Sequence, residues 1–343
     1  ANRFLSTSRT REELRQTLLG KTNNLSPSPP HIHGLLYYKL TASEYLYLSL
    51  NTCLRPYKLR RLHLELTSSV LDLDWNETKT KLERFIKDYV EKTKTKGIVL
   101  GLSGGVDSCT VAALSALAIG GEKVLGLMLP EHETFSKKDI EHAETVAEKF
   151  KVKTKTIDIT PTLEQFYSTI PNFDQADNVC KGNIKARTRM VYIYYHANKL
   201  GKLVCGSSDK SETMMGYFTK WGDVAADISP IMDLYKTQVR KLAKYLGIPQ
   251  EIASKPSSPA LWPGQLAENE LGIKYEQLDL ILYGLERFMR TEEIAKQLKT
   301  KKEIVEKIEQ RWFSAEHKRK MLLTAKMEYR TVGTDFRLPR DPH

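Results

Sequence analysis

From residue 75 onward, short apolar runs alternate with longer stretches whose apolar residues recur at helical spacing. The apolar runs predict strands at 97–102, 123–129, 152–159 and 202–206. The stretches around them predict helices at 75–93, 108–119, 136–150, from 161 onward and at 183–200. Strands that alternate with helices are typical of an α/β fold, so we expect a doubly wound, mostly parallel sheet flanked by helices.

The first strand and the first helix show this pattern most clearly. The run GIVLGL, residues 97–102, is apolar throughout, as is typical of a strand buried on both faces. In the first helix, the apolar residues Leu82, Phe85, Ile86 and Val90 recur at helical intervals. Asn76 is the expected N-cap of this helix.

The C-terminal part of the chain has a different pattern. Residues 235–246, 275–290 and 302–320 predict helices with no strand between them. We expect these helices to pack on the sheet as a lid or subdomain. The sequence therefore predicts one domain over residues 71–330, followed by a C-terminal tail at 331–343.

Residues 1–70 differ from the rest because they contain turn-rich and proline-rich stretches and have no clear amphipathic face. They suit a disordered basic tail, a small appendage domain, a transit peptide, or upstream sequence translated in frame with a true start near Val70. We expect a basic, irregular N-terminal extension, disordered or non-native, without a catalytic role. Protease digestion is then expected to leave an active core that starts near residue 70.

Composition and charge exclude some classes of protein. No apolar run approaches the roughly 18–20 residues that a membrane-spanning helix needs. The formal net charge is +11, and residues 1–70, with ten Lys and Arg against four Asp and Glu, carry a large share of it. The mild excess elsewhere suits an anionic small-molecule substrate, so we do not expect nucleic acid as the main partner. The cysteines form no CxxC pair and lack the spacing of a zinc site, so we expect them to be thiols in a reducing cytoplasm. They are Cys53, Cys109, Cys180 and Cys205.

The stretch Ser-Gly-Gly-Val-Asp-Ser at 103–108 lies between the first predicted strand and the next helix. At such a position, free backbone N–H groups and the helix dipole favour an anion, and glycines let the backbone approach phosphate oxygens. The stretch is neither GxGxxG nor the GxxxxGK[ST] loop, since no lysine follows the second glycine. A carboxylate beside phosphates indicates Mg²⁺ between them, so Asp107 is a candidate ligand; a helix cap is its alternative role.

Ser103–Ser108 resembles the SGGxDS pyrophosphate-binding loop of the ATP pyrophosphatases. Four further stretches narrow the resemblance: GNIKARTRM at 182–190, GSSDKSETMMGYFTKWGDVAADISPI at 206–231, LYKTQVRKLAKYLGIP at 234–249 and EHKRK at 316–320. In this order they look like ammonia-dependent NAD synthetase. The resemblance implies an enzyme that adenylates the nicotinate carboxylate of deamido-NAD with ATP, releases pyrophosphate, and lets ammonia displace AMP to give NAD.

The resemblance also implies roles for individual residues. Asp107 and Glu212 are expected to bind Mg²⁺ and, with Lys236, to serve catalysis. The expected ATP-binding residues are Gly101, Leu102, Ser103, Gly104, Gly105, Val106, Asp107, Ser108, Ser207, Lys236 and Ser258. The expected deamido-NAD-binding residues are Arg187, Lys220, Asp227, His317 and Lys318. Arg and Lys suit a dinucleotide with a free carboxylate, whereas Asp227 suits a ribose hydroxyl or a basic neighbour.

Taken alone, several of these residues have plainer interpretations. Glu212 suits the first turn of a helix, where the helix dipole favours an acidic side chain. Lys236 suits a solvated surface lysine, and EHKRK suits the charged C-terminus of a helix. Glu212 follows the fourth predicted strand, which we expect to lie next to the first. Glu212 and Asp107 are then expected to meet at one edge of the sheet.

The chain departs from the family pattern at three places. Ser207 stands where the family has threonine, so the hydroxyl remains. In PGQLAENELG, Leu266 and Ala267 replace a hydroxyl and a carboxylate, and the run KPSSPALW around Ser258 is permuted. We expect these changes to affect rate or loop closure rather than the type of reaction.

Free ammonia is the expected nitrogen donor, with or without a separate glutaminase, because glutamine-using relatives carry an amidase domain much larger than residues 1–70. The family also implies a homodimer.

Two other functions stay open: a tRNA-modifying ATP pyrophosphatase with a basic RNA arm, and a nucleotide-binding module without chemistry. The lack of a CxxC pair is against thiolating enzymes, and intact Asp107 and Glu212 are against a non-catalytic module.

Overall fold

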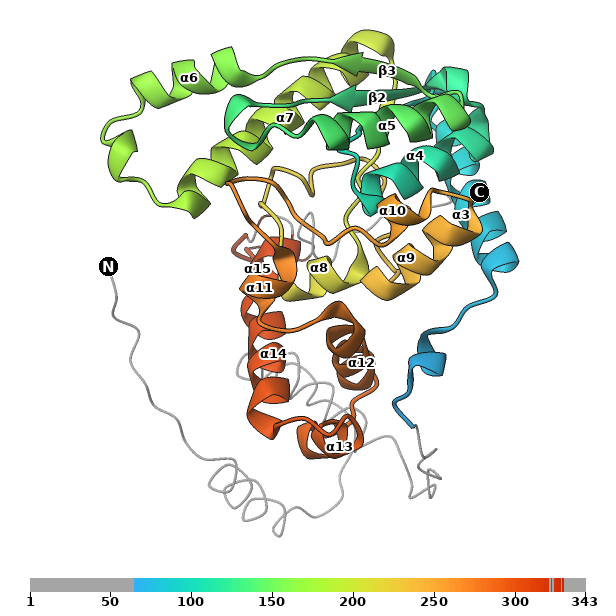
Figure 1. Cartoon of the computed structure of the whole chain (residues 1–343), viewed down its shortest axis with the longest axis vertical. Coiled ribbons are helices and arrows are strands. Elements are labelled where there is room, and N and C mark those ends of the chain that lie inside the picture. Colours follow the sequence, from blue (N-terminus) through green and yellow to red (C-terminus); the bar gives the residue numbers. More distant parts are fainter. Residues whose placement is uncertain (1–64, 321, 323, 328, 330–343) are drawn as a thin grey trace. The chain divides into compact units, whose positions relative to one another are not determined.

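The domain contains a parallel sheet of four strands, which lies in the upper part of Figure 1, above the C-terminal helices. The strands are β1 Ile98–Gly101, β2 Val124–Met128, β3 Lys153–Thr156 and β4 Leu203–Val204. Their order is β3-β2-β1-β4, and Ile98 of β1 pairs with Val124 on one side and Leu203 on the other. The predicted parallel α/β fold is confirmed, with all four strands shorter than the predicted runs, β3 and β4 most of all.

The computed structural model describes residues 65–320, 322, 324–327 and 329. The predicted tail at 331–343 and residues 1–64 of the predicted extension lie outside the described residues. Leu66 is buried against Gly284, and its N–H donates to Gln297 Oε1 at 2.7 Å. The packed domain therefore includes residues just before the expected boundary at 71. Within the described residues, no helix is long and apolar enough to cross a bilayer.

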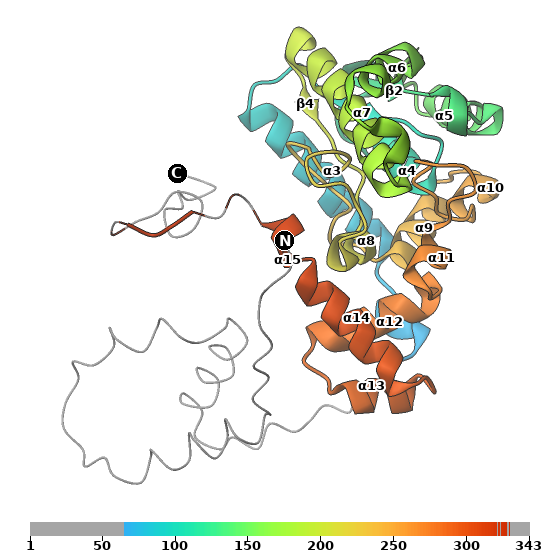
Figure 2. The same cartoon turned by 90° about the vertical axis from the view of Figure 1, so that its left-hand side faces the viewer.

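Helices cover both faces of the sheet (Figures 1 and 2). The first face carries α3 Trp75–Lys92, α4 Val106–Ile119, α5 Lys137–Lys149, α9 Lys236–Tyr245 and α10 Gln250–Ala253. The second face carries α6 Thr160–Thr169 and α7 Asn178–Leu200. Successive side chains of β1 alternate between the two cores: Ile98 and Leu100 join the first, and Val99 joins the second. This is why GIVLGL is apolar throughout.

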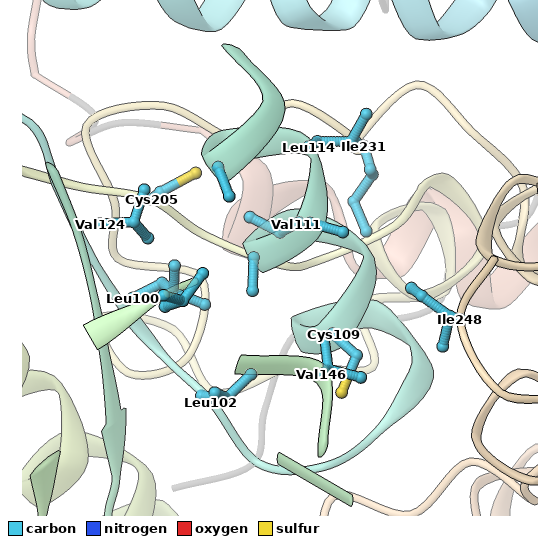
Figure 3. Packing of buried hydrophobic residues seen from close by; sticks show 14 of the residues in the cluster. Leu100, Leu102, Cys109, Val111, Leu114, Val124, Val146, Cys205, Ile231 and Ile248 are labelled. Atoms are coloured by element: carbon cyan, nitrogen blue, oxygen red, sulfur yellow. The ribbon is translucent and has the colours of Figure 1, made fainter. Parts of the chain in front are cut away.

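The first core is filled by α4, a helix that is buried along most of its length (Figure 3). Val111 and Leu114 of this helix are fully buried in one cluster with Leu100, Val124 and Cys205. A helix surrounded by other elements has no need of a polar face, so its sequence shows apolar and small residues on all sides.

The remaining helices lie in the C-terminal half of the chain. They are α8 Lys210–Met215, α11 Ala267–Leu271, α12 Tyr275–Glu286, α13 Thr291–Gln297, α14 Lys302–Ser314 and α15 Glu316–Arg319. Helix α12 packs on α8 and α9, and α14 packs on α8 and α13. Helices α12 and α14 therefore contact α8 and α9, whose first turns carry Glu212 and Lys236. Short 3₁₀ turns are η1 Ser68–Leu71, η2 Gly121–Lys123, η3 His132–Thr134 and η4 Phe173–Gln175.

Differences from the predicted elements have local causes. The N-cap of α3 is Asp74 and not Asn76, because the Asp74 carboxylate accepts the N–H of Glu77 at 2.8 Å. Helix α7 begins ahead of the predicted residue 183, because Asp177 caps it by accepting the N–H of Cys180 at 2.7 Å. Helices α10, α11 and α13 were not predicted, since helices of 4, 5 and 7 residues are too short to show a period.

Candidate active site

The Ser103–Ser108 loop joins the carboxyl end of β1 to the start of α4, as predicted. Its two hydroxyl oxygens lie 3.0 Å apart, and Ser108 Oγ accepts the N–H of Ser103 at 3.2 Å. Gly104 has φ +77°, and a Cβ at this position would lie 2.0 Å from the carbonyl oxygen of Asp139. The loop therefore requires glycine at 104. It exposes the N-terminus of α4, where backbone N–H groups lack helical partners, to an anion.

A cleft of about 350 Å³ opens at the carboxyl ends of the strands. The predicted ATP-binding residues that line it are Gly101, Leu102, Ser103, Gly105, Val106, Asp107, Ser108, Ser207 and Ser258. Leu127 and Met128 of β2 and Met190 and Ile193 of α7 give the same cleft an apolar wall. An apolar wall next to a loop that favours phosphate suits a nucleotide, which has a flat base and charged phosphates.

Lys236, the first residue of α9, is completely buried among three carboxylates. Its Nζ lies 2.7 Å from Asp107 Oδ2, 2.7 Å from Asp209 Oδ2 and 2.7 Å from Glu212 Oε1. The ring of Tyr275 also faces this nitrogen, with its centroid 5.4 Å away. We call Asp107, Asp209, Glu212 and Lys236 the carboxylate–lysine cluster. The expected meeting of Asp107 and Glu212 at one edge of the sheet is confirmed.

Lys236 stabilises the charges of the three carboxylates, whereas the carboxylates repel one another. Burial alone would lower the pKa of Lys236, but the three carboxylates outweigh burial and hold this pKa well above its ordinary value. Burial raises the pKa of Glu212 well above its ordinary value; Asp209 raises it further, and Lys236 opposes the rise. Lys236 is therefore a permanent cation, and the buried carboxylates need it, or another cation, as a partner.

The three carboxylates fit a divalent cation. One oxygen from each lies within 4.8 Å of those from the other two. Asp107 Oδ1 is buried and has no hydrogen-bond partner among the described residues. Carboxylate oxygens are the ligands that Mg²⁺ prefers, usually one or two of them together with phosphate oxygens. The cluster can therefore hold Mg²⁺ beside a phosphate bound at the Ser103–Ser108 loop.

A buried hydrogen-bond network behind the cluster fixes the start of α9. Asp279 of α12 accepts the hydroxyl of Ser211 at 2.6 Å, and it accepts both the N–H and the hydroxyl of Thr237, at 2.9 Å and 2.7 Å. Ser211 Oγ in turn accepts the N–H of Lys236 at 2.9 Å. The first two N–H groups of α9 are thus held by α8 and α12. This network gives the C-terminal helices a part in placing Lys236.

Asp279→Asn is expected to change how stability depends on pH. Burial raises the pKa of Asp279 to about 7, more than its hydrogen bonds lower it. Between pH 5 and pH 7 the native Asp279 keeps a proton that the unfolded chain has lost, so the wild type loses stability relative to the variant as pH rises. The change is up to about 3 kcal/mol and levels off above pH 7. Urea unfolding of both proteins at pH 5, 7 and 8 measures it; a pH-independent difference would contradict the raised pKa.

The segment at 255–261 forms another wall of the cleft. It is fastened by an ion pair between Lys255 and Asp139 of α5, and by the Thr134 hydroxyl, which donates to the carbonyl of Ala260 at 3.0 Å. Ser258 Oγ accepts the N–H of Ala260 at 3.1 Å and lines the cleft. The permuted KPSSPALW run therefore still places a hydroxyl on the cleft.

The Leu266 and Ala267 departures fall at the start of α11. Ala267 is buried, and its N–H donates to the carbonyl of Ser257 at 3.0 Å. Leu266 is the N-cap, and a leucine side chain has no atom that can accept a helix N–H. With leucine at this position, the first turn of this short helix has no side-chain cap.

Leu266→Thr is expected to have a free energy of unfolding about 1 kcal/mol higher than Leu266→Ala, because a threonine hydroxyl can accept an N–H of the first turn. Leu266 is 38% exposed, so both substitutions lose the apolar contact of its covered part, and the comparison between them isolates the cap. Leu266→Ala is the control, since it removes the leucine without adding a cap. Chemical denaturation compares the three proteins, and equal stability of the Thr and Ala variants would contradict the prediction.

None of the predicted dinucleotide-binding residues is among the described residues that line the cleft. Four of them form one basic cluster: Arg187 Nη2 donates to the carbonyl of Lys220 at 3.2 Å, and Lys220 Nζ donates to the carbonyl of His317 at 2.7 Å. Lys318 Nζ donates to carbonyls in the segment just before Lys220. Asp227 is placed apart from them, where its Oδ2 accepts the N–H of Val204 at 2.7 Å.

Two residues in or beside the cleft were missed from the sequence. Asp209 belongs to the carboxylate–lysine cluster, and its side chain also accepts the N–H of Glu212 at 2.8 Å. An aspartate three residues before Glu212 has the spacing of an N-cap, which was a usable signal. Arg189 lines the cleft on the same face of α7 as Met190 and Ile193, and its Nε donates to the carbonyl of Leu129 at 3.2 Å. Helical spacing places Arg189 on the same face of the helix as Met190 and Ile193, and this spacing was the signal in the sequence.

Comparison with known proteins gives consistent results. The NAD synthase family profile matches residues 78–322. The NH₃-dependent NAD⁺ synthetase of Hyperthermus butylicus is 46% identical over 255 residues, covering 74% of this chain and 92% of that protein. The corresponding enzyme of Methanocaldococcus jannaschii is 47% identical over 247 residues, covering 71% and 94%. Among solved structures, NMN synthetase from Francisella tularensis aligns with a TM-score of 0.66 and 34% identity, covering 75% of this chain and 100% of that chain.

Proposed function

Because the chain belongs to the NAD synthase family, we propose that it converts deamido-NAD, ATP and ammonia to NAD, AMP and pyrophosphate. It is an NH₃-dependent NAD⁺ synthetase, a ligase that forms a carbon–nitrogen bond. The strongest support is that the Ser103–Ser108 loop and the carboxylate–lysine cluster meet at one cleft. A phosphate site and a cation site next to each other suit the cleavage of ATP between its α- and β-phosphates.

The chemistry has two steps. A carboxylate is a poor electrophile, so an oxygen of the nicotinate carboxylate first attacks the α-phosphorus of ATP, and the bond from this phosphorus to the bridging oxygen breaks. Pyrophosphate leaves and an acyl-adenylate forms. Ammonia then attacks the carbonyl carbon, AMP leaves with the carboxylate oxygen, and the nitrogen loses a proton to give the amide. The first step needs two anions, ATP and deamido-NAD, held together, and the second needs ammonia held against the carbonyl carbon; both depend on a fixed orientation.

The residues of the cleft suit this task. The N–H groups at the start of α4 and the hydroxyls of Ser103 and Ser108 are placed to hold the departing pyrophosphate. Lys236 supplies a positive charge beside the same phosphates. Ser207 and Ser258 offer further hydroxyls on the cleft. These groups act by binding and orienting, which is how most of the barrier to phosphoryl and nucleotidyl transfer is lowered.

We propose that Asp107 and Glu212, with Asp209 behind them, hold Mg²⁺. The fit rests on three carboxylate oxygens within 4.8 Å and on the unpartnered Asp107 Oδ1. When bound, Mg²⁺ would neutralise charge on the phosphate oxygens. Asp107 belongs to the loop that is placed to hold phosphate, so a cation bound by Asp107 also lies beside that phosphate.

We also propose that the enzyme works as a homodimer. Arg187 lies on an exposed stripe of α7 with Val191 and Tyr195, which are 58% and 57% exposed. A stripe of large apolar side chains at helical spacing suits a partner helix. A second copy seated here would cover the side on which Arg187 and its basic cluster lie, so the dinucleotide site would be shared between the two subunits.

Val191→Asp is expected to convert the dimer to monomers, because it buries a charge in the proposed apolar contact. Val179→Asp is a matched control: Val179 is also 58% exposed on α7, but it lies about a third of a turn away from the stripe. Light scattering coupled to size exclusion measures the mass of each protein. A monomeric wild type, or equal effects of the two substitutions, would contradict this interface.

The function is tested by incubating the full chain with ATP, Mg²⁺, ammonium and either deamido-NAD or nicotinate mononucleotide. Chromatography then measures NAD, NMN and AMP. We expect NAD and AMP in equal amounts and a clear preference for the dinucleotide. A preference for the mononucleotide would place the chain with the Francisella tularensis protein, whose name gives NMN as the product. No amide product from either substrate, with the protein folded, would overturn the proposal.

A further inference from the structure

Lys236 occupies the point where the carboxylates of the cluster converge. Its Nζ is 2.7 Å from an oxygen of each of Asp107, Asp209 and Glu212. The side chains of Lys236 and Asp209 are both completely buried. A divalent cation held by all three carboxylates needs one oxygen from each of them around a single point, and Nζ already occupies such a point. The ammonium and the metal therefore cannot hold this position together.

We propose that Lys236 and the divalent cation compete for the carboxylate–lysine cluster, so that the metal binds strongly only after the ammonium has moved to a phosphate of ATP. In this arrangement Asp209 is the third carboxylate of the site. The inference rests on the proposed role of the cluster as a Mg²⁺ site. It goes beyond that role because it sets the order of binding: nucleotide and metal enter together, and metal alone binds weakly.

Charge balance supports this competition. Three carboxylates in a mostly buried site are stable only with a positive partner, and Lys236 supplies it. An ammonium nitrogen lies 2.7 Å from these oxygens, whereas Mg²⁺ binds oxygens at about 2.1 Å and needs them closer together. A metal that arrives alone must therefore displace a well-paired lysine and contract the site. Both costs oppose binding of the metal by itself.

The neighbouring phosphate loop gives the lysine another partner. Asp107 is the second residue of α4 and lines the cleft, so it joins the cluster to the place where the loop favours phosphate. A phosphate at the start of α4 would lie next to Asp107 and offers Lys236 an anion in exchange for its carboxylates. After the exchange, phosphate pairs with lysine, the carboxylates pair with Mg²⁺, and no buried charge is left without a partner.

The test uses Mn²⁺ alone as the probe, with the full chain at pH 8 and no nucleotide. Electron paramagnetic resonance counts free Mn²⁺, so a titration gives the Kd without any turnover. Lys236→Met removes the competing ammonium, and we expect it to lower the Kd for Mn²⁺ by about tenfold or more relative to the wild type. Lys236→Gln keeps a polar side chain of similar length and is expected to show the same gain, so the test does not depend on the folding of one variant.

Two controls identify the site. Lys210→Met removes a lysine from α8 that pairs with Asp233 and Glu286 and does not belong to the cluster, and it is expected to leave the Kd at the wild-type value. Lys236→Met combined with Asp209→Asn is expected to lose most of the gained affinity. A wild type that binds Mn²⁺ as tightly as both Lys236 variants would overturn the competition. If such a chain still amidates deamido-NAD, the proposed function stands and only this inference fails.

Discussion

Asp107→Asn is expected to lower kcat by about a thousandfold or more while the domain stays folded. The substitution removes the carboxylate that belongs both to the phosphate loop and to the carboxylate–lysine cluster. Asparagine is nearly the same shape, so packing is preserved. Lys236 keeps Asp209 and Glu212 as partners, and Asp107 is 21% exposed, so the loss of one charge does not unfold the site.

Initial rates of NAD formation measure the effect, with circular dichroism as the check on folding. Asp233→Asn is the control for removing a carboxylate, because Asp233 is 96% exposed and pairs only with Lys210 among the ion pairs of the described residues. We expect this control to keep nearly wild-type activity. An Asp107→Asn enzyme that turns over within tenfold of the wild type would show that this carboxylate does not serve the chemistry.

Gly104→Ala is expected to lower the free energy of unfolding by more than about 3 kcal/mol and to abolish turnover. Two costs combine. The φ of +77° is unfavourable for any residue with a Cβ, and that Cβ would lie 2.0 Å from the carbonyl oxygen of Asp139. Since the obstacle is backbone and not a flexible side chain, either the loop or α5 has to move. Any such movement displaces the N–H groups that are placed for phosphate.

Gly264→Ala separates the two costs. Gly264 has φ +72°, yet nothing lies within 4 Å of a Cβ placed there. It carries the conformational cost alone and is expected to lose only about 1 kcal/mol. Denaturant unfolding of both variants gives the difference. Equal losses for Gly104→Ala and Gly264→Ala would mean that the loop can shift away from Asp139 at no cost.

The sheet could be predicted because its pattern is local. The run GIVLGL is apolar at successive positions because Val99 faces one core while Ile98 and Leu100 face the other. The short strand β4 and the short helix α11 gave weaker signals, since a few residues cannot show a period. The N-cap of α3 was misplaced because Asp74 and Asn76 are both suitable caps, and only the hydrogen bond to Glu77 distinguishes them.

The part of the candidate site that lies in one sequence motif was predicted. The part that the fold brings together from separate segments was missed. Asp107 lies in the phosphate loop, so its surroundings follow from the sequence nearby. Asp209 meets Lys236 only because β4 lies beside β1 and α9 packs next to α8. No local pattern shows that a lysine at the start of α9 is completely buried; this depends on the helices around it.

The most direct test of the account uses deamido-NAD labelled with ¹⁸O in its nicotinate carboxylate, together with ATP, Mg²⁺ and ammonium. Mass spectrometry measures the NAD and the AMP that form. If the carboxylate attacks the α-phosphorus, each turnover yields one NAD and one AMP, and each AMP from doubly labelled substrate carries one ¹⁸O. Unlabelled AMP, ADP in place of AMP, or no NAD above the blank would contradict the account.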